Sequence, residues 1–448
     1  MHFMKKFVLT ITVIALLLTF AACGNDAPAD TNVQEGNYIT EGYFAEQPTQ
    51  PATEPEDPDE ILAYRRDLVE QEMRRMSSVL WTPAEPITYH MANKSSGIEV
   101  AGKEDPKHVI TFTPGNIYQG IPYAHGGGSG YSWLAFATAQ DEKGVYTLSG
   151  MTTEILSGSG GNTPFNYSRL GNDCADQLFW AWGQVSSSIS FHGTSTMTEG
   201  NGCLKIGSYV ANGNFSKENN TYSIVEQNGR ETMFAAYSLM QKGDAIVNYT
   251  PNGAGHTVMI VECHTEYLSD GTVDSVNSYV IVLEQTGANE INQTKEFNEV
   301  IGKDVYLCER LDAKWSFEEI FGKGYLPITC KELIDPSPRA ELQLTDSAKE
   351  PSVDNMFSGT VASNYRISDI TIRIMDANGN LLQKATCFSR QIEMLTFDLS
   401  RFINPAEAQS MQGEIALDKL GEGTYRCTYT ARISTGEQIV FRDFAFTR

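Results

Sequence analysis

The stretch GNDCADQLFWAW, residues 171–182, predicts a helix near the middle of this 448-residue chain. Leu178, Ala181 and Trp182 recur at the spacing of one helical face, and Cys174 lies on that same face. Because this face is apolar, we expect the helix to pack against a β-sheet.

We expect a reactive thiolate at the start of this helix. Asp173 or Asn172 can cap the helix, which places Cys174 in its first turn. The unpaired backbone N–H groups and the helix dipole favour a thiolate over a thiol at such a position. The same N–H groups can stabilise a tetrahedral oxyanion. A buried Cys on an amphipathic helix, with no catalytic role, is the alternative.

A second pair of segments supplies a candidate base. The residues GDAIV, 243–247, end a helix and begin a strand. The residues GHTVMIV, 255–261, begin another strand with His256 at its mouth. An imidazole placed there can present a ring nitrogen to a thiolate on a helix that packs against the sheet.

A third polar residue follows the next predicted strand. Thr257–Cys263 and Tyr279–Leu283 read as strands with an Asp-Gly turn between them, so we expect them to pair antiparallel. Glu284 or Gln285 ends the second strand and can orient the imidazole of His256. Glu284 is favoured over Gln285. Two surface strands with ordinary polar ends are the alternative.

Four segments in this order and spacing resemble the NlpC family of cell-wall cysteine peptidases. The residues GIPYAHGG, 120–127, resemble the family's G-x-P-Y-x-W-G-G segment. Gly171 to Cys174 resembles its glycine-x-aspartate-cysteine nucleophile motif, and Gly243-Asp244 and Gly255-His256 resemble its G-D and G-H strand motifs. The resemblance covers roughly residues 120–285.

This resemblance implies a papain-like α+β fold and hydrolysis of amide bonds in the stem peptides of peptidoglycan. Carried over, Cys174 attacks the carbonyl and His256 takes and returns the proton. Tyr123 would hydrogen-bond near the oxyanion or the substrate. Typical members orient the base with His or Asn, whereas Glu284 followed by Gln285 is similar to the related CHAP amidases. An amidase acting at the sugar–peptide link is therefore an alternative. No metal or organic cofactor is implied.

The chain departs from the family pattern beside the nucleophile and in the groove. The family has Ser-Gly after the nucleophile, whereas Asp176 occupies the second position here. An ionised carboxylate so close to the thiolate would disfavour it. His125 replaces the usual Trp, and the long segment 128–170 is expected to reshape the groove. Substrate choice is therefore less defined than reaction class.

Other readings of the same residues remain open. His125, His192 and His264 are further candidate bases, but none of them starts a strand after Gly-Asp. A surface-binding lipoprotein that kept the fold without catalysis is the alternative to an enzyme. The joint presence of Cys174, His256 and a polar third residue favours the enzyme.

The N-terminus reads as an export signal. Lys5 and Lys6 precede an apolar run, Phe7–Phe20, that is too short to span a bilayer as a mature helix. The small residues before Cys23 resemble the lipobox of bacterial lipoproteins, although Phe20 stands where Leu is usual. This resemblance implies a lipid anchor on Cys23 at the outer face of the cell membrane. Ordinary signal cleavage and secretion is the alternative.

The chain divides into four parts by composition. Residues 1–22 read as the signal peptide, and residues 23–56 as a disordered tether that is too polar to fold. Residues 57–337 read as the papain-like hydrolase domain with an N-terminal helix over 57–80, begun by Asp-Pro. Residues 338–448 read as an all-β sandwich, whose repeated short strands and Gly-Thr-Tyr segment resemble immunoglobulin-like modules.

Further helices and strands are expected on either side of that boundary. Glu231–Met240 reads as a helix, and Arg65, Arg66, Arg74 and Arg75 as a solvated face of the N-terminal helix. In the sandwich, Ile370–Met375 and Leu381–Thr386 are expected to form a hairpin across Asp376–Asn380. Alternation over 424–433 predicts a half-buried strand that turns back at Gly436 into Ile439–Phe446.

Charge and cysteine content exclude some classes of function. The formal net charge of −23 repels nucleic acid and anionic lipid headgroups, so no nucleic-acid partner is expected. Apart from Cys23 and Cys174, six cysteines remain, and no pair has the CxxC spacing of a zinc site. Disulfides and buried free thiols are both open for these six.

Overall fold

The computed structural model describes the greater part of the chain in several segments. These are residues 55–91, 109–123, 137–149, 154–157, 172–186, 189, 193–199, 201–285, 294–337, 339–388, 395–404 and 411–448. The expected signal peptide and lipid-attachment residue, Cys23, lie outside the described residues. So do His125, His192 and Gly171.

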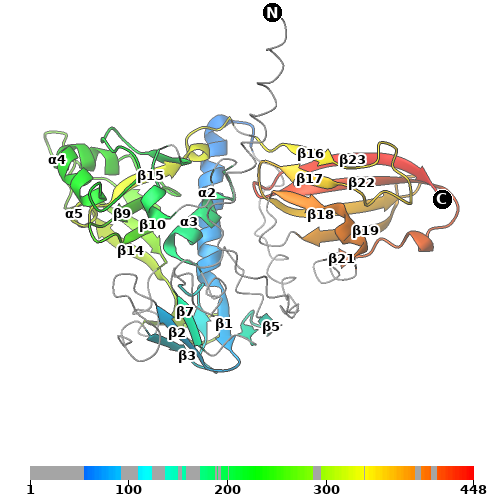
Figure 1. The fold of residues 1–448 in the computed structure, drawn as a ribbon, viewed down its shortest axis with the longest axis horizontal. Coiled ribbons are helices and arrows are strands. Elements are labelled where there is room, and N and C mark those ends of the chain that lie inside the picture. The colour runs from blue at the N-terminus through cyan, green and yellow to red at the C-terminus, as the bar shows by residue number, and fades with distance from the viewer. Residues whose placement is uncertain are drawn as a thin grey trace, which may run out of the picture. The chain divides into compact units, whose positions relative to one another are not determined.

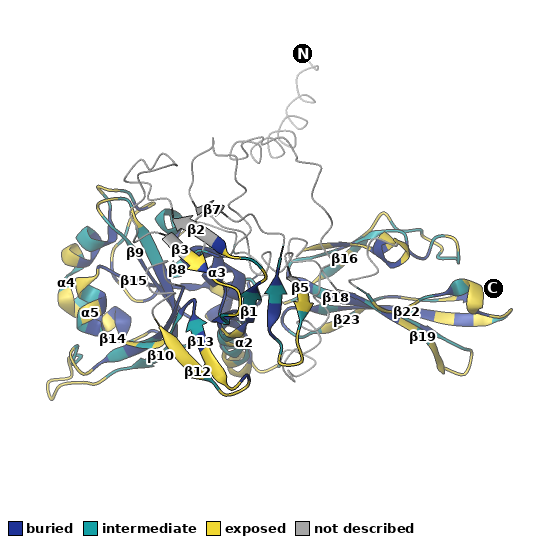
Figure 2. Cartoon of the chain, turned by 90° about the horizontal axis from the view of Figure 1, so that it is seen from below, coloured by how far each residue is buried: buried dark blue, intermediate teal, exposed yellow. Residues whose placement is uncertain are grey.

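The described residues form an α+β fold in which strands outnumber helices (Figure 1). Its buried apolar side chains gather mainly into two separate clusters. The first draws on residues between Leu68 and Leu333, and the second on residues between Met356 and Phe446. Figure 2 marks the buried residues along the helices and strands in dark blue. Burial of these two sets of side chains is the main favourable term in the folding of each region.

Helix α2, Pro58–Ser78, begins where the sequence predicted. Asp57 caps it by accepting hydrogen bonds from the backbone N–H groups of Asp59 and Glu60. The apolar side chains on one face of the helix are buried, among them Val69 and Met73. The prediction of an amphipathic helix is confirmed.

The prediction for two of the arginines of α2 is wrong. Arg65 and Arg66 are buried rather than solvated. Arg65 Nη1 donates to the carbonyl oxygen of Glu332 at 3.1 Å, and Arg66 Nη1 donates to Asp244 Oδ1 at 2.9 Å. Hydrophobic patterning missed them because a guanidinium can be buried when acceptors satisfy its N–H groups.

A six-stranded antiparallel sheet forms the centre of the first region, in the order β14-β11-β10-β9-β15-β8. Its strands are β8 (Cys203–Lys205), β9 (Ala245–Tyr249), β10 (Gly255–His264), β11 (Tyr279–Glu284), β14 (Arg310–Ser316) and β15 (Leu326–Cys330). The predicted antiparallel pairing of β10 with β11 is confirmed, with Met259 opposite Leu283. The ends of these two strands are thereby fixed relative to each other.

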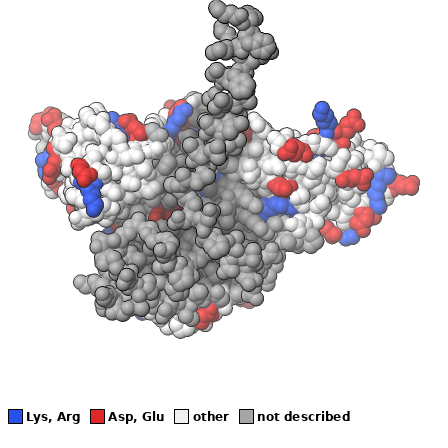
Figure 3. All heavy atoms as spheres, in the orientation of Figure 1, with Lys and Arg blue, Asp and Glu red and all other residues white. Residues whose placement is uncertain are grey.

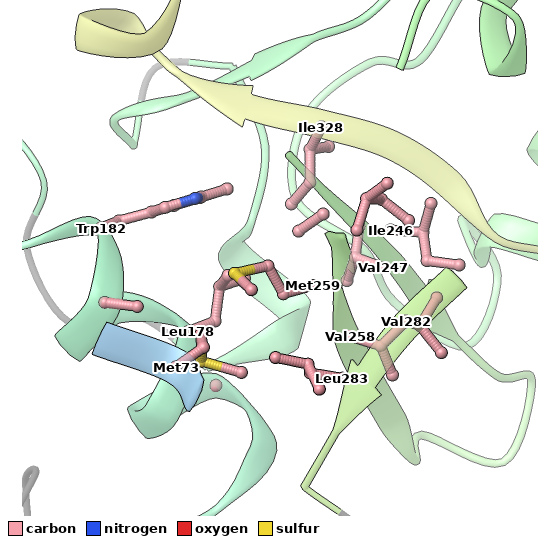
Figure 4. Packing of buried hydrophobic residues seen from close by; sticks show 14 of the residues in the cluster. Met73, Leu178, Trp182, Ile246, Val247, Val258, Met259, Val282, Leu283 and Ile328 are labelled. Carbon is pink, nitrogen blue, oxygen red and sulfur yellow. The ribbon is translucent and has the colours of Figure 1, made fainter. Parts of the chain in front are cut away.

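Helix α3, Cys174–Trp182, lies where the opening motif predicted and packs with the central sheet. Leu178 on α3, Met259 on β10 and Met73 on α2 belong to one buried cluster (Figure 4). Trp182 is fully buried and donates its indole N–H to the carbonyl oxygen of Gly243 at 2.8 Å. Apolar packing together with this hydrogen bond fixes how the helix lies on the sheet.

Helix α4, Thr221–Tyr237, differs from its predicted range of 231–240. It starts earlier, with Asn220 as its cap, and it ends earlier. Gly229 interrupts it with a φ of 75°, a left-handed conformation that glycine adopts without steric cost. The sequence pattern predicted only the part after that break. A short helix, α5 (Phe317–Gly322), follows β14.

Two further sheets complete the first region. A mixed six-stranded sheet has the order β12-β13-β4-β1-β6-β5, and a three-stranded sheet has the order β3-β2-β7. Their strands are β1 (Leu80–Pro83), β2 (Ile87–Met91), β3 (Val109–Phe112), β4 (Tyr118–Gln119), β5 (Ala137–Gln140), β6 (Tyr146–Leu148), β7 (Glu154–Ser157), β12 (Lys295–Asn298) and β13 (Lys303–Leu307).

The C-terminal region is all-β and sandwich-like, with sheets in the order β16-β17-β20 and β21-β19-β18-β22-β23. Its strands are β16 (Leu342–Thr345), β17 (Thr360–Ser363), β18 (Ile367–Met375), β19 (Leu381–Phe388), β20 (Thr396–Asp398), β21 (Met411–Gly413), β22 (Thr424–Ile433) and β23 (Gln438–Thr447). The predicted hairpin of β18 with β19 and the pair β22–β23 are confirmed. Cys387 and Cys427 are buried in its core.

The described segments contain no disulfide, no surface patch of one charge in the view of Figure 3 and no membrane-spanning helix. All seven cysteines in the described segments are free thiols. On the face shown in Figure 3, the described Lys and Arg side chains lie interspersed with Asp and Glu. None of the helices in the described segments is long and apolar enough to cross a membrane.

The contact of α3 with the sheet can be tested by truncating Leu178, which is 1% exposed. We expect Leu178→Ala to lower the free energy of unfolding by about 2–5 kcal/mol, because it leaves a cavity between helix and sheet. Leu239, which is 57% exposed, is the matched control, and Leu239→Ala should change the value by less than about 0.5 kcal/mol. Denaturant unfolding measures both. Equal effects would show that Leu178 does not hold the helix.

Candidate active site

The backbone of α3 places Cys174 as the first residue of the helix. Asp173 is the cap, and its Oδ1 accepts hydrogen bonds from the N–H groups of Ala175 and Asp176, each at 2.9 Å. Asp176 completes a capping box by accepting from the N–H of Asp173 at 3.3 Å. Cys174 is 7% exposed. Its thiol therefore lies at the positive end of the helix dipole and is largely shielded from water.

The ring of His256 interacts with both of its expected partners. Its Nε2 lies 2.8 Å from Glu284 Oε1. The side chain of Cys174 lies close enough to raise the pKa of the same ring. Because Nε2 faces the carboxylate, Nδ1 is the nitrogen left for the sulfur. Helix α3 and strands β10 and β11 thus bring together the three residues that the sequence singled out.

Electrostatics around the ring favour an imidazolium. Burial lowers the pKa of His256, but the neighbouring Cys174 and Glu284 outweigh it and raise the pKa to about 10. The pKa of Glu284 is lowered even though burial opposes this, because His256 and then Arg310 and Lys323 favour the carboxylate. The site therefore favours an ion pair of His256 with Glu284 at neutral pH.

Arg310 holds the second oxygen of Glu284, and the sequence analysis did not identify it. Arg310 Nη1 lies 2.7 Å from Glu284 Oε2. The two residues stand opposite each other in the pairing of β14 with β11. No local motif marks Arg310, because its contact depends on strand register. A prediction of β14 as the partner of β11 would have been the signal that could find it.

Gly255 explains the start of β10. A Cβ atom at this position would lie 1.8 Å from Oγ1 of Thr194, in the 3-10 turn η4 (Thr194–Thr196), so only glycine fits. This close approach lets the turn lie against the strand immediately before His256. The Gly-His pair therefore combines a packing requirement with the position of the base.

Gly243-Asp244 has a structural role beside the site. Asp244 is buried, and it accepts from Arg66 Nη1 at 2.9 Å and from the N–H of Gln241 at 2.7 Å. The carbonyl of Gly243 accepts the indole N–H of Trp182. This segment joins α2 and the end of α3 to the sheet.

Asp176 does not place a second negative charge beside the thiol at neutral pH. Its side chain is buried, and burial, followed by the charge of Asp173, raises its pKa to about 9. The hydrogen bond from the N–H of Asp173 lowers the pKa by less. A neutral carboxyl at Asp176 removes the repulsion that the sequence suggested.

The segment that contains Tyr123 lies directly beside the nucleophile helix. Tyr123 forms a parallel β-bridge with Asn172, and the N–H of Asn172 donates to the carbonyl of Pro122 at 3.2 Å. Gln285 does not contact the imidazole. Its Nε2 donates to the carbonyl of Ile121 at 2.6 Å, so it supports this segment instead.

Tyr325 and His264 have different relations to the site. Burial raises the pKa of Tyr325, and the charges of Glu284 and Cys174 raise it further, which places this phenol near both. The side chain of His264 is 41% exposed, its Nε2 lies 2.8 Å from Glu266 Oε1 and its ring stacks on Tyr279, at the opposite end of β10 from His256. Across the described segments, no group of three or more His, Cys, Asp or Glu side chains is arranged to hold a metal ion.

Comparison with known proteins gives no family for the chain. No family model and no curated protein matches it. Solved structures that resemble it include CopC from Methylosinus trichosporium OB3b (14% identity, TM-score 0.16, covering 24% of this chain and 92% of that one). A tetra-tandem repeat of a large adhesion protein shares 12% identity, with a TM-score of 0.16, over 46% of this chain and 40% of that one. Dimeric latent PorU from Porphyromonas gingivalis shares 12% identity, with a TM-score of 0.15, over 46% and 24%. Similarities this low support no conclusion about fold or function.

The contact between Glu284 and His256 can be tested by titration. We expect Glu284→Gln to lower the pKa of His256 by about 1–3 units, because it removes the negative charge that favours the imidazolium. NMR of the ring C–H resonances over pH measures this shift. Glu266→Gln is the matched control, since it removes the partner of His264 only. An unchanged His256 titration in Glu284→Gln would contradict the assignment.

The same pKa sets the direction of pH-dependent stability. The pKa of His256 in the folded protein lies above its ordinary value of about 6.5. The stability that protonated His256 contributes is therefore fully present below about pH 6.5. The contribution is lost as pH rises toward about 10.

Proposed function

We propose that this chain is a cell-wall cysteine hydrolase with a papain-like, NlpC-type domain, cleaving amide bonds in the stem peptides of peptidoglycan. The observation that carries the proposal is the imidazole of His256, which hydrogen-bonds to Glu284 and whose pKa is raised by the neighbouring Cys174. A nucleophile, a base and an orienting acid in this relation are the components of nucleophilic acyl transfer.

In the first step of the proposed reaction, the sulfur of Cys174 attacks the carbonyl carbon of the scissile amide. His256 holds the proton of the thiol and passes it to the leaving amine when the C–N bond breaks. A thioester on Cys174 and a free amine result. Water then attacks the thioester while His256 takes its proton, and a carboxylic acid and the free thiol are released.

The N–H of Cys174 is the donor best placed for the oxyanion. The side chain of Asp173 takes up the N–H groups of Ala175 and Asp176, and its carbonyl accepts from Gln177 at 3.1 Å. This leaves the N–H of Cys174 as the donor of the first turn that can face a substrate. Tyr123, in the segment beside the helix, is the proposed second donor.

Glu284 keeps the amidase alternative open. The related CHAP amidases use a Glu as the third residue, and here it is Glu284, not Gln285, that contacts His256. Both reactions use the same thiol chemistry, so the mass of the released fragments separates them. Lipidation of Cys23 would hold the domain at the outer face of the cell membrane, within reach of the cell wall. Without it, the protein would be secreted.

The activity is tested by digesting purified peptidoglycan. We expect wild type to release soluble fragments, and Cys174→Ala to lower the rate by at least about a thousandfold, because no acyl-enzyme can form. Mass analysis of the fragments identifies the cleaved bond. Cys263→Ala, which alters a thiol at the far end of β10, is the control and should retain activity. Intact peptidoglycan after treatment with wild type would favour a surface-binding protein.

Thiol reactivity separates enzyme from binder without a substrate. We expect iodoacetamide to label Cys174 rapidly at neutral pH, and His256→Ala to slow labelling by about tenfold or more, because it removes the cation that favours the thiolate. Peptide mass spectrometry follows the modified residue over time. Labelling no faster than that of a free thiol, with no effect of His256→Ala, would support the non-catalytic reading.

A further inference from the structure

Glu309 is a buried acid that neither the expected motif nor the proposed reaction uses. It lies just before β14 and is 3% exposed. Its carboxylate accepts from Gln177 Nε2 at 2.8 Å, from the N–H of Ile121 at 3.2 Å and from the hydroxyl of Ser77. The N–H groups of Gln177 and Ile121 can only donate, which suits an ionised carboxylate, whereas the hydroxyl of Ser77 also lies 2.9 Å from the carbonyl oxygen of Met73 and can either donate or accept.

The three donors come from elements that shape the site. Gln177 lies on α3, one turn beyond Cys174. Ile121 belongs to the segment that pairs through Tyr123 with Asn172, two residues before α3, and Ser77 lies in the last turn of α2. One carboxylate thus ties the nucleophile helix to the segment beside it and to α2.

The next residue, Arg310, holds Glu284 from the other side of the site. Two consecutive residues therefore contact the two halves of the proposed machinery: Glu309 contacts the element that carries Cys174, and Arg310 contacts the acid that orients His256. Since both belong to one short stretch of backbone, a change at Glu309 can alter how the thiol meets the imidazole.

We propose that Glu309 is a positioning residue, which in its ionised form holds the nucleophile helix and the Ile121 segment in place and thereby sustains the reactivity of Cys174. This inference rests on the proposed function of Cys174. A protonated carboxyl could donate to the hydroxyl of Ser77, which then donates to the carbonyl of Met73, but the hydrogen bonds from Gln177 and Ile121 would lose the negative charge that strengthens them. Gln177 could respond by rotating its amide, because its Oε1 has no hydrogen-bond partner among the described residues.

The surroundings of Glu309 support a change of charge near neutral pH. Burial raises its pKa to about 7, against three hydrogen bonds that lower it. The pKa values of the titratable neighbours lie further above neutrality. Burial raises the pKa of Cys308 well above that of an ordinary thiol, and Asp176 on α3 has a pKa of about 9. On β14, Arg310 pairs with Glu284.

The charged residues of α2 nearest in sequence to Ser77 have partners of their own. Arg75 pairs with Glu72, and Arg74 pairs with Glu70 and Asp312. The segment at Ile121 contributes only a backbone N–H. Glu309 is thus the one group facing this cluster of donors that we expect to change charge close to neutrality.

The test is the rate of alkylation of Cys174 by iodoacetamide in the full chain, between about pH 5.5 and pH 8.5. We expect the wild-type rate to fall by about tenfold below a break near the pKa of Glu309, beyond the fall caused by thiol protonation. Glu309→Gln carries a neutral amide of the same shape, so it should show the low-pH rate throughout and lack the break. Alkylation of Glu309→Gln with the wild-type profile would overturn the proposal.

Glu72→Gln is the matched control. Glu72 is a buried carboxylate that also joins α2 to α3, by accepting the indole N–H of Trp180 at 2.7 Å. If Glu309 only linked α2 to α3 mechanically, replacing Glu309 and replacing Glu72 should change the pH profile of alkylation in the same way. We therefore expect Glu72→Gln to keep the wild-type pH profile, and loss of the break in both variants would refute a specific role of Glu309.

A second variant covers the case in which Glu309→Gln does not fold. Gln177→Met removes one donor from the carboxylate, so the break should move up by about one pH unit. A break that stays in place would contradict the proposal. Failure of the proposed hydrolase is a different result: wild type would release no peptidoglycan fragments, whether or not the break in alkylation depends on Glu309.

Discussion

The interactions of the ring of His256 with Cys174 and with Glu284 are the contacts on which the proposed site depends. They connect the first residue of a helix to the ends of two neighbouring strands. These contacts can form only when α3 packs on the central sheet in a single, defined orientation. The buried contacts of Leu178 and Met259, together with the hydrogen bond of Trp182, fix that arrangement.

Two buried carboxyl groups near the site differ in protonation state. Glu284 stays ionised because His256 and Arg310 each hold one of its oxygens. Asp176, without a cation, takes up a proton at neutral pH and leaves the thiol unopposed. Burial of a carboxyl is costly unless a cation or several donors compensate, and each of these residues follows that rule. The result is a local field that favours the positively charged imidazolium form of His256.

Local sequence signals predicted the parts of the site that depend on local structure. Asp173 as a cap and His256 at the start of an apolar strand could be read directly, since capping and alternation act over a few residues. Arg310 and Glu309 could not, because their contacts join residues that are far apart in the chain, and the contact of Arg310 also depends on sheet register. The early start of α4 was missed because Gly229 interrupts the helical pattern.

The most direct test of the central claim is to trap the acyl-enzyme. Wild-type protein would be mixed briefly with peptidoglycan fragments, quenched with acid, and examined by mass spectrometry of the peptide that contains Cys174. The account predicts a thioester adduct on Cys174 whose mass corresponds to part of a stem peptide, and its absence in His256→Ala. Release of fragments with no adduct on Cys174 would contradict it.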